Sequence, residues 1–244
     1  MNRTDNPVCT LSERLKFYDC DYKNRIKIST ILKIAAEIAG YDYTVKGYGH
    51  EFLWKNQMVF LMSRMSLRIL KYPAEYEVLK MSTWECGKKG AIFLRGTDIA
   101  DESGEIIIEA LSGWVLANPE TRHIYKPSAF RFEMPQLPEK TVDTLDIGKI
   151  PHENVIYVMN RDVRITDLDS NGHVYNAIYA DIACDAMAKA DYEKDVYDFR
   201  INFVSEAKLG DRIDIFSGES EKAVVIIGKV GEKVCFETEY TFKN

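Results

Sequence analysis

The order of predicted elements repeats once along the chain, and this repeat constrains the fold more than any other feature. In each half, a polar turn leads into an amphipathic helix, and several alternating strands follow. The segment that begins at Asp21 can be laid over the segment that begins at Asp169 at a constant offset of 148 residues. We infer that one unit was duplicated, each copy a long helix held against a curved antiparallel sheet.

Two helices are expected at equivalent points of the halves. The first begins near Ser29, which is a suitable N-cap, and ends near Gly40. The second is expected over residues 174–190, where apolar residues recur four positions apart. Strands are expected where apolar residues alternate with polar ones, at 64–69, 77–84, 91–99, 106–116, 199–204, 212–216, 223–230 and 234–243.

The last of these strands has the clearest pattern, which predicts one buried face and one wet face. A turn at Gly231 pairs it with the strand before, and residues 101–104 form another hairpin turn. Between the halves, residues 131–151 contain three prolines and few periodic apolar residues. A chain of 244 residues suits two domains. We therefore expect an N-terminal domain over 1–130, a linker over 131–151 and a C-terminal domain over 152–244.

The composition excludes several classes of protein. The net charge of -6 disfavours a nucleic-acid-binding protein, and no apolar run is long enough for a membrane span. The five cysteines are scattered and form no CxxC pair, which disfavours a zinc site or a disulfide framework. We expect a cytoplasmic protein that holds no metal or cofactor.

The most informative segment lies just before the second predicted helix. Asp167, Asp169, Asn171 and His173 fall within seven positions there. Such residues are common in turns and helix caps, so composition alone favours a structural role. The repeat changes the balance, because the first copy keeps the aspartate (Asp21) but carries Lys23 and Arg25 in place of Asn171 and His173. A cap that the fold needs should persist in both copies, whereas a catalytic set needs only one.

The run Asp-Leu-Asp-Ser-Asn-Gly-His-Val-Tyr-Asn at 167–176 resembles the D-L-D-x-N-x-H-V-N-N signature of plant and bacterial acyl-acyl-carrier-protein thioesterases. Residues 91–94, 101–104 and 112–116 resemble the N-terminal hotdog of that family, and 199–206 resembles its strand with a catalytic glutamate. The resemblance implies an α+β tandem hotdog. Tyr175 departs from the signature, and Ala207 stands where the plant enzymes carry a cysteine.

The resemblance also implies a catalytic set, Asp169, Asn171, His173 and Glu206, that hydrolyses fatty acyl thioesters. Without a suitable cysteine or serine, we expect attack by water with a carboxylate as general base. The sequence leaves open whether Asp169 or Glu206 is that base. Backbone N–H groups at the start of the second helix would stabilise the oxyanion. Asp167 is expected to cap the loop, and Cys184 to be a small buried residue.

The resemblance implies acyl carrier protein with a phosphopantetheine-linked chain as the partner, and two fused hotdogs allow a monomer or a homodimer. The N-terminal half would shape the acyl pocket, although its aromatic and Met-rich stretch suits ordinary core equally well. Because acyl carrier protein is acidic, a local basic patch should receive it. The aromatic and Met-rich stretch contains Trp54, Met58, Phe60, Met62 and Met65. The candidates for the basic patch are Arg64, Arg68, Lys71, Lys88 and Lys89.

Three other functions remain open. One is hydrolysis of acyl-coenzyme A, which would use the same residues. Another is a double-hotdog hydratase or dehydratase that acts on a carbon–carbon double bond. The third is a non-catalytic acyl-binding protein. The intact polar cluster favours an enzyme, since a hotdog fold alone would not separate these functions.

Overall fold

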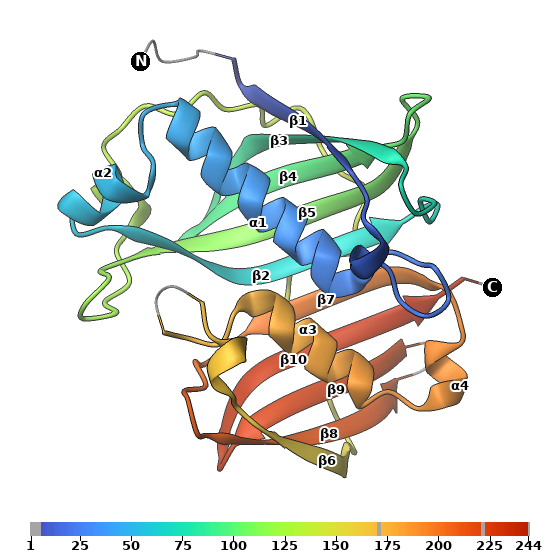
Figure 1. The fold of residues 1–244 in the computed structure, drawn as a ribbon. Coiled ribbons are helices and arrows are strands. Elements are labelled where there is room, and N and C mark those ends of the chain that lie inside the picture. The colour runs from blue at the N-terminus through green and yellow to red at the C-terminus, as the bar shows by residue number, and fades with distance from the viewer. Residues whose placement is uncertain (1–5, 170–171, 221–222, 244) are drawn as a thin grey trace. The chain divides into compact units, whose positions relative to one another are not determined.

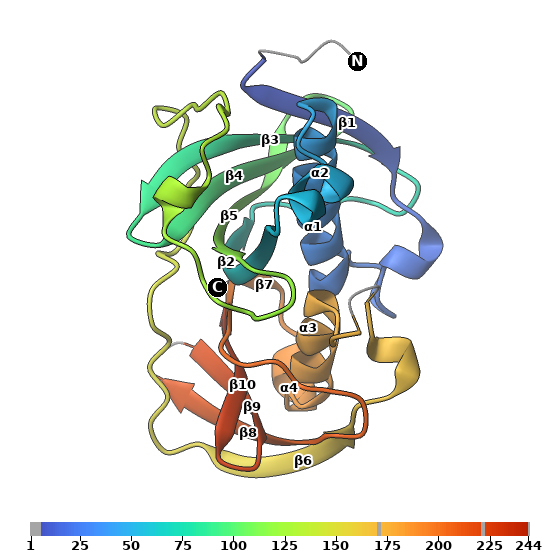
Figure 2. The ribbon, with the colours of Figure 1, turned by 90° about the vertical axis from the view of Figure 1, so that its left-hand side faces the viewer.

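In the computed structural model, residues 6–169, 172–220 and 223–243 are described. The chain divides into two compact units, which are treated separately below. The first comprises Met1–Ser63 and Leu70–Thr144, and the second comprises Arg64–Ile69 and Leu145–Asn244. Each unit has a helix against one face of an antiparallel sheet (Figures 1 and 2).

The sheet of the first unit has the strand order β1-β3-β4-β5-β2. Helix α1 (Ile28–Val45) lies across it and buries a broad apolar stripe that includes Ile31 and Ile38. A short helix, α2 (His50–Lys55), follows. The strands are β1 (Val8–Arg14), β2 (Val59–Ile69), β3 (Val78–Lys89), β4 (Ile92–Ala100) and β5 (Ile106–Ala117), with single 3-10 turns at Phe17–Asp19 and Pro127–Ala129.

Helix α1 differs from its prediction at both ends. Its N-cap is Lys27, not Ser29, and Ser29 is buried in the first turn. The helix starts early because Ile28 is already part of the core, only 6% exposed. It also continues past Gly40, because the contacts of Asp42 with Arg95 and of Tyr43 with Glu85 outweigh the low helix propensity of one glycine.

In the second unit, residues Arg64–Ile69 of β2 pair with β7, and the order continues β10-β9-β8-β6. Helix α3 (Asn176–Asp185) packs on β9 and β10. The strands are β6 (Ile156–Asp162), β7 (Val196–Phe203), β8 (Arg212–Ser220), β9 (Ala223–Val230) and β10 (Lys233–Phe242), with a 3-10 turn at Ile165–Asp167.

The prediction of one continuous helix over 174–190 is wrong in its extent. Helix α3 ends at Asp185, and a separate turn of helix, α4, covers Lys189–Tyr192. Ala188 between them is extended, with ψ at 140°. The break lets the chain turn while Ala186 and Met187 stay in the core.

The prediction that one face of β10 is exposed to solvent is also partly wrong, because Cys235 and Glu239 are buried. A register shift between Val234 and Phe236 turns the strand at Cys235. Glu239 is buried because both its carboxylate oxygens accept hydrogen bonds from Arg200 on β7, each 2.9 Å long.

The hairpin turns at 101–104 and Gly231 are confirmed, and residues 131–151 contain no helix or strand. None of the described helices is both long and apolar enough to cross a bilayer.

Candidate active site

The second unit brings an imidazole and a carboxylate together in front of α3. His173 ends a tight turn just before the helix, and Glu206 lies in the loop between β7 and β8. The His173 Nε2 atom is 3.3 Å from Glu206 Oε2. The two side chains are 23% and 40% exposed, so a substrate can reach both. Of the predicted set, these two residues form a pair that can exchange a proton.

Asp169 shapes the turn that presents His173. Its carboxylate Oδ1 accepts the N–H of His173 at 3.2 Å, and its own N–H donates to the His173 carbonyl at 2.8 Å. Gly172 closes the turn with φ at 77°, in the left-handed region that suits glycine. Asn171, the fourth predicted member, lies outside the described residues.

Asp167 caps the preceding 3-10 turn, as predicted. Its Oδ2 accepts the backbone N–H of Arg164 at 2.8 Å, and its Oδ1 pairs with Arg161 at 2.7 Å. The Asp167 carbonyl in turn accepts the N–H of Tyr175. The first-turn N–H groups of α3, from Asn176 and Ala177, donate to no atom in the described part of the chain. They are the donors a helix start offers to negative charge.

Two cysteines of this unit have partners that argue against a thiol nucleophile. The Cys184 thiol is half-buried and 3.7 Å from the Tyr240 hydroxyl. Cys235, which sequence reasoning did not single out, lies beside the Glu206 loop, since its carbonyl accepts the N–H groups of Val204 and Ser205. Burial raises the pKa of the Cys235 thiol, so it stays protonated at neutral pH.

The first unit repeats the turn without its chemistry. Asp21 Oδ1 accepts the N–H of Arg25, as Asp169 Oδ1 accepts that of His173. Asn24 takes the left-handed conformation of Gly172, with φ at 63°. Here, however, the Arg25 guanidinium forms an ion pair with Asp21 at 2.8 Å, and both side chains are almost fully buried. The duplicated loop is therefore a structural element in the first unit.

The loop that holds Glu206 is duplicated as well, at an offset of 134 residues. Ala74 donates its N–H to Glu77, and Lys208 donates its N–H to Asp211, the equivalent pair. At this offset Glu206 corresponds to Tyr72, whose ring lies 5.9 Å from the Arg25 guanidinium. Where the second unit pairs a histidine with a glutamate, the first stacks an arginine on a tyrosine.

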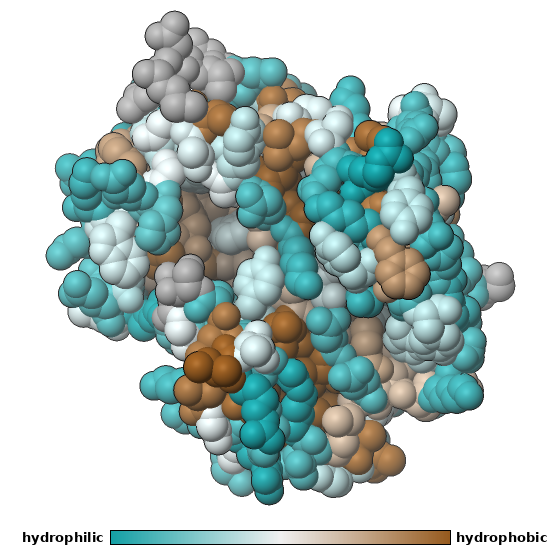
Figure 3. Space-filling view, viewed as in Figure 1, coloured by the Kyte–Doolittle hydropathy of each residue, from teal (hydrophilic) through white to brown (hydrophobic). Residues whose placement is uncertain are grey.

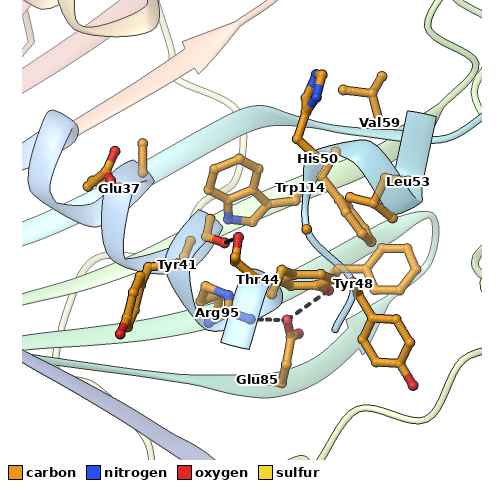
Figure 4. Close-up of a pocket in the computed structure, with 17 residues that line it drawn as sticks. Glu37, Tyr41, Thr44, Tyr48, His50, Leu53, Val59, Glu85, Arg95 and Trp114 are labelled. Atoms are coloured by element: carbon orange, nitrogen blue, oxygen red, sulfur yellow. Dashed lines mark hydrogen bonds and ion pairs between the residues drawn. The ribbon is translucent and has the colours of Figure 1, made fainter. Parts of the chain in front are cut away.

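A cavity of about 390 Å³ opens in the first unit between α1, α2 and the sheet. It appears as a hollow with brown apolar walls between these two helices in Figure 3. Figure 4 shows aromatic and aliphatic side chains from all three elements around it, among them Tyr41, Leu53 and Trp114. Behind them an aromatic cluster that includes Phe130 makes edge-to-face contacts with Phe60 and Phe93. The walls are therefore mostly apolar.

One wall of the cavity is charged. Arg95 on β4 contacts Glu85 on β3 at 2.5 Å (Figure 4). Tyr43 donates its hydroxyl to the same carboxylate oxygen at 3.1 Å. Arg95 also pairs with Asp42 at 2.9 Å, and Asp42 with Lys46 at 2.5 Å. Burial opposes the charge on Arg95, but these carboxylates outweigh it and raise the pKa of the guanidinium. Two buried cations thus balance two buried anions.

The weaker predictions for the first half meet mixed outcomes. Of the aromatic and Met-rich stretch, Phe60 lines the cavity, Met58 packs on the aromatic cluster, and Met62 and Met65 are buried core residues. Sequence reasoning missed Glu85 and Arg95, because neither carries a motif. Four of the five basic candidates have partners: Arg68 is bound to Asp198, Lys71 pairs with Asp101, Lys88 lies over the Phe93 ring, and Arg64 donates to the Ile147 carbonyl. The fifth, Lys89, is exposed at the end of β3. A basic patch for the carrier stays a prediction.

Comparison with known proteins places these features in a family. Residues 11–128 match the acyl-ACP thioesterase N-terminal domain, and residues 152–241 match the acyl-ACP thioesterase C-terminal domain. The chain belongs to the acyl-ACP thioesterase family. The resemblance found in the sequence is thereby confirmed.

Individual relatives agree with this family. The chain is 25% identical to the oleoyl-acyl carrier protein thioesterase of Coriandrum sativum, over 91% of this chain and 67% of that one. It is 25% identical to the palmitoyl-acyl carrier protein thioesterase of Cuphea hookeriana, over 68% of this chain and 43% of that one. It spans half the length of an Arabidopsis thaliana oleoyl-acyl carrier protein thioesterase, to which it is 27% identical over 68% of its own length.

Two solved structures share the fold over almost the whole chain. An acyl-ACP thioesterase from Bacteroides thetaiotaomicron has a TM-score of 0.89 and 21% identity, covering 98% of this chain and 99% of its own. The 12:0-ACP thioesterase from Umbellularia californica has a TM-score of 0.79 and 15% identity, covering 98% of both. The α+β tandem hotdog predicted from the sequence is confirmed.

Proposed function

We propose that this protein hydrolyses fatty acyl thioesters of acyl carrier protein and releases the free fatty acid and the carrier thiol. One observation carries the proposal: His173 and Glu206 meet at 3.3 Å in front of α3, at the position of the family signature. The first unit, which retains the same two loops, has Arg25 and Tyr72 there. A histidine and a carboxylate in reach of solvent form a general-base pair, whereas an arginine and a tyrosine do not.

Glu206 is the better candidate for the base. The Asp169 Oδ1 atom accepts the backbone N–H of His173. The Asp21 Oδ1 atom accepts that of Arg25 in the same way, in a turn that has no imidazole. The aspartate therefore has a role in loop structure that is independent of catalysis. Glu206 has no such counterpart, because Tyr72 holds its place in the first unit.

In the proposed reaction, Glu206 takes a proton from water while the water oxygen attacks the thioester carbonyl carbon. His173 holds the carboxylate in place and shares the proton. The N–H groups of Asn176 and Ala177 would stabilise the oxyanion of the tetrahedral intermediate. When that intermediate collapses, the carbon–sulfur bond breaks, and the departing thiolate receives the proton that water lost. Asn171 is proposed to orient the water or the substrate.

The cavity of the first unit is the proposed site for the acyl chain. Its walls are mostly apolar and aromatic, and pockets of this kind bury hydrocarbon ligands. The partner would be acyl carrier protein, with the 1–130 and 152–244 domains supplying the chain pocket and the chemistry. Acyl-coenzyme A presents the same thioester, so the alternative is hydrolysis of coenzyme A esters. The cysteines are free thiols, which suits a cytoplasmic enzyme of fatty acid synthesis.

A panel of substrates tests the proposal. Acyl carrier protein thioesters of several chain lengths, with the matching coenzyme A esters, are incubated with the purified protein, and release of free thiol is followed. Glu219→Gln serves as a control for Glu206→Gln, since Glu219 is exposed at the far end of β8. We expect hydrolysis of carrier-bound chains, which Glu206→Gln should slow by at least about 100-fold and Glu219→Gln should leave unchanged. If no ester in the panel is hydrolysed, the proposal is wrong; faster turnover of coenzyme A esters would reassign the substrate.

A further inference from the structure

The residue after Glu206 is held by a buried tyrosine from α3. The backbone N–H of Ala207 donates a hydrogen bond of 3.1 Å to the hydroxyl oxygen of Tyr179. Both partners are in the core, with Ala207 fully buried and Tyr179 only 4% exposed. A hydrogen bond in such surroundings is worth more than one in water, and losing its acceptor leaves a buried N–H unpaired.

The tyrosine itself has little freedom to move. Its ring packs at 5.9 Å from the ring of Phe203 and 5.3 Å from that of Phe236, which come from β7 and β10. Burial raises the pKa of the Tyr179 phenol, so the hydroxyl stays neutral at physiological pH. The Tyr179 hydroxyl oxygen, which accepts the Ala207 N–H, is therefore held in one position and belongs to a neutral group.

The first unit shows that the loop does not need this bond in order to fold. Its equivalent loop keeps the same backbone hydrogen bonds: Leu70 and Lys71 donate to Ile107, as Val204 and Ser205 donate to Cys235. The two ends of the loops also match, since Tyr76 donates to the Leu15 carbonyl and Gly210 to that of Val163. The loop conformation is therefore encoded by contacts that both copies share.

The two units differ at both partners of the hydrogen bond between Ala207 and Tyr179. The residue equivalent to Ala207 is Pro73, which is also buried but has no N–H to donate. The residue equivalent to Tyr179 is Ile31, which has no hydroxyl and is 1% exposed. Donor and acceptor are both absent from the copy that lacks the His–Glu pair, and both are present in the copy that has it. A bond needed only for folding should have persisted in both copies.

We infer that Tyr179 is a positioning residue for the reaction: its hydroxyl fixes the Ala207 amide so that the Glu206 carboxylate stays within reach of His173. This inference rests on the proposed function. The tyrosine acts through the backbone one residue from the base and not by touching the substrate. Displacing a catalytic group by about 1 Å can cost 100-fold in rate, so a small shift of the loop is enough to matter.

The test compares Tyr179→Phe with Tyr240→Phe. Both remove one hydroxyl from a buried ring, but the Tyr240 hydroxyl faces Cys184 instead of Ala207. We expect Tyr179→Phe to lower kcat by at least about tenfold, which corresponds to one buried hydrogen bond, with KM within twofold. Tyr240→Phe should keep kcat within about twofold. Amide hydrogen exchange at Ala207 should accelerate in the first variant and stay unchanged in the second.

A double variant separates positioning from general destabilisation. In a Glu206→Gln background, Tyr179→Phe should cause no further loss of kcat, because the group that it positions is gone. Full activity of Tyr179→Phe, unchanged exchange at Ala207, or an undiminished additional loss in the Glu206→Gln background would each overturn the inference while leaving the proposed function intact. Absence of thiol release by the wild-type protein would instead overturn the proposed function.

Discussion

Arg25 and His173 occupy the same position in the two copies of one loop. Each residue donates its backbone N–H to an aspartate four residues earlier. The Arg25 side chain then turns back onto that aspartate, whereas the His173 imidazole meets a glutamate from another loop. The same backbone therefore serves a structural ion pair in one unit and a proposed catalytic pair in the other.

This relationship predicts opposite effects for two matched substitutions. Arg25→Ala leaves Asp21 as a buried charge without its guanidinium, and should lower the free energy of unfolding by about 3 kcal/mol with kcat unchanged. His173→Ala removes a partly exposed side chain, and should lower kcat by at least about 100-fold with little change in stability. Thermal unfolding and thiol release measured on both variants check this. Loss of activity in the arginine variant at a temperature where it stays folded would contradict it.

A second prediction concerns the length of the acyl chain. Ala36 lines the cavity from α1, and Ala36→Leu adds a larger side chain there with only a small loss of helix propensity. We expect the ratio of kcat/KM values to shift toward shorter chains by about tenfold, since one methylene in an apolar pocket is worth about that much. The measurement is competition between carrier-bound esters of different lengths.

The control for this prediction is Lys33→Leu, on the exposed side of the same helix. Its chain-length profile should match that of the wild type. An identical profile for Ala36→Leu would mean that the acyl chain lies elsewhere.

A third prediction excludes a thiol nucleophile. Burial raises the pKa of Cys235 beside the Glu206 loop, so iodoacetamide, which attacks thiolates, should react slowly there. We expect Cys235→Ala and Cys184→Ala to retain kcat within about threefold, and no acyl group to remain on the protein when turnover is stopped with acid. A covalent acyl adduct seen by mass spectrometry would contradict attack by water.

The fold follows from the sequence where periodicity is strong and less well elsewhere. The repeat at 148 residues, the strands β4 and β9 and the hairpin turns are predictable, because alternation and glycine turns are local signals. Strands β1 and β6 were missed, because both lie at sheet edges, where many side chains are exposed and alternation is weak. Buried Glu239 contradicts its pattern because its partner Arg200 is on another strand.

The candidate site also contains residues that the sequence predicts and residues that it does not. The turn that carries His173 is visible in the sequence, because its residues are contiguous and form a known signature. Tyr179 and Arg95 have no such signal: their partners, Ala207 and Glu85, are brought near only by folding. Tyr179 differs from its counterpart Ile31 at the offset of 148 residues, but the offset of 134 residues that relates Ala207 to Pro73 is evident only from the loop hydrogen bonds of the structure.

Alkaline pH provides a fourth prediction. Burial raises the pKa values of the Tyr43, Tyr179 and Tyr240 phenols above their ordinary value of 10.0. Above about pH 10 the unfolded chain loses these protons while the folded chain keeps them, so stability falls as pH rises. Tyrosinate absorbance should then include a late component that appears together with loss of the far-ultraviolet circular dichroism. Full ionisation of all tyrosines in the folded state would contradict the burial of these three.

The kcat of Glu206→Gln, on the carrier-bound acyl ester that the wild type prefers, tests the proposed role of Glu206 as general base. The substitution keeps the shape of the side chain and removes its capacity to take a proton. We expect a fall in kcat of at least about 100-fold with an unchanged melting temperature and an unchanged KM. A folded Glu206→Gln variant with kcat within threefold of the wild type would show that Glu206 is not the base, and the proposed catalytic pair would be wrong.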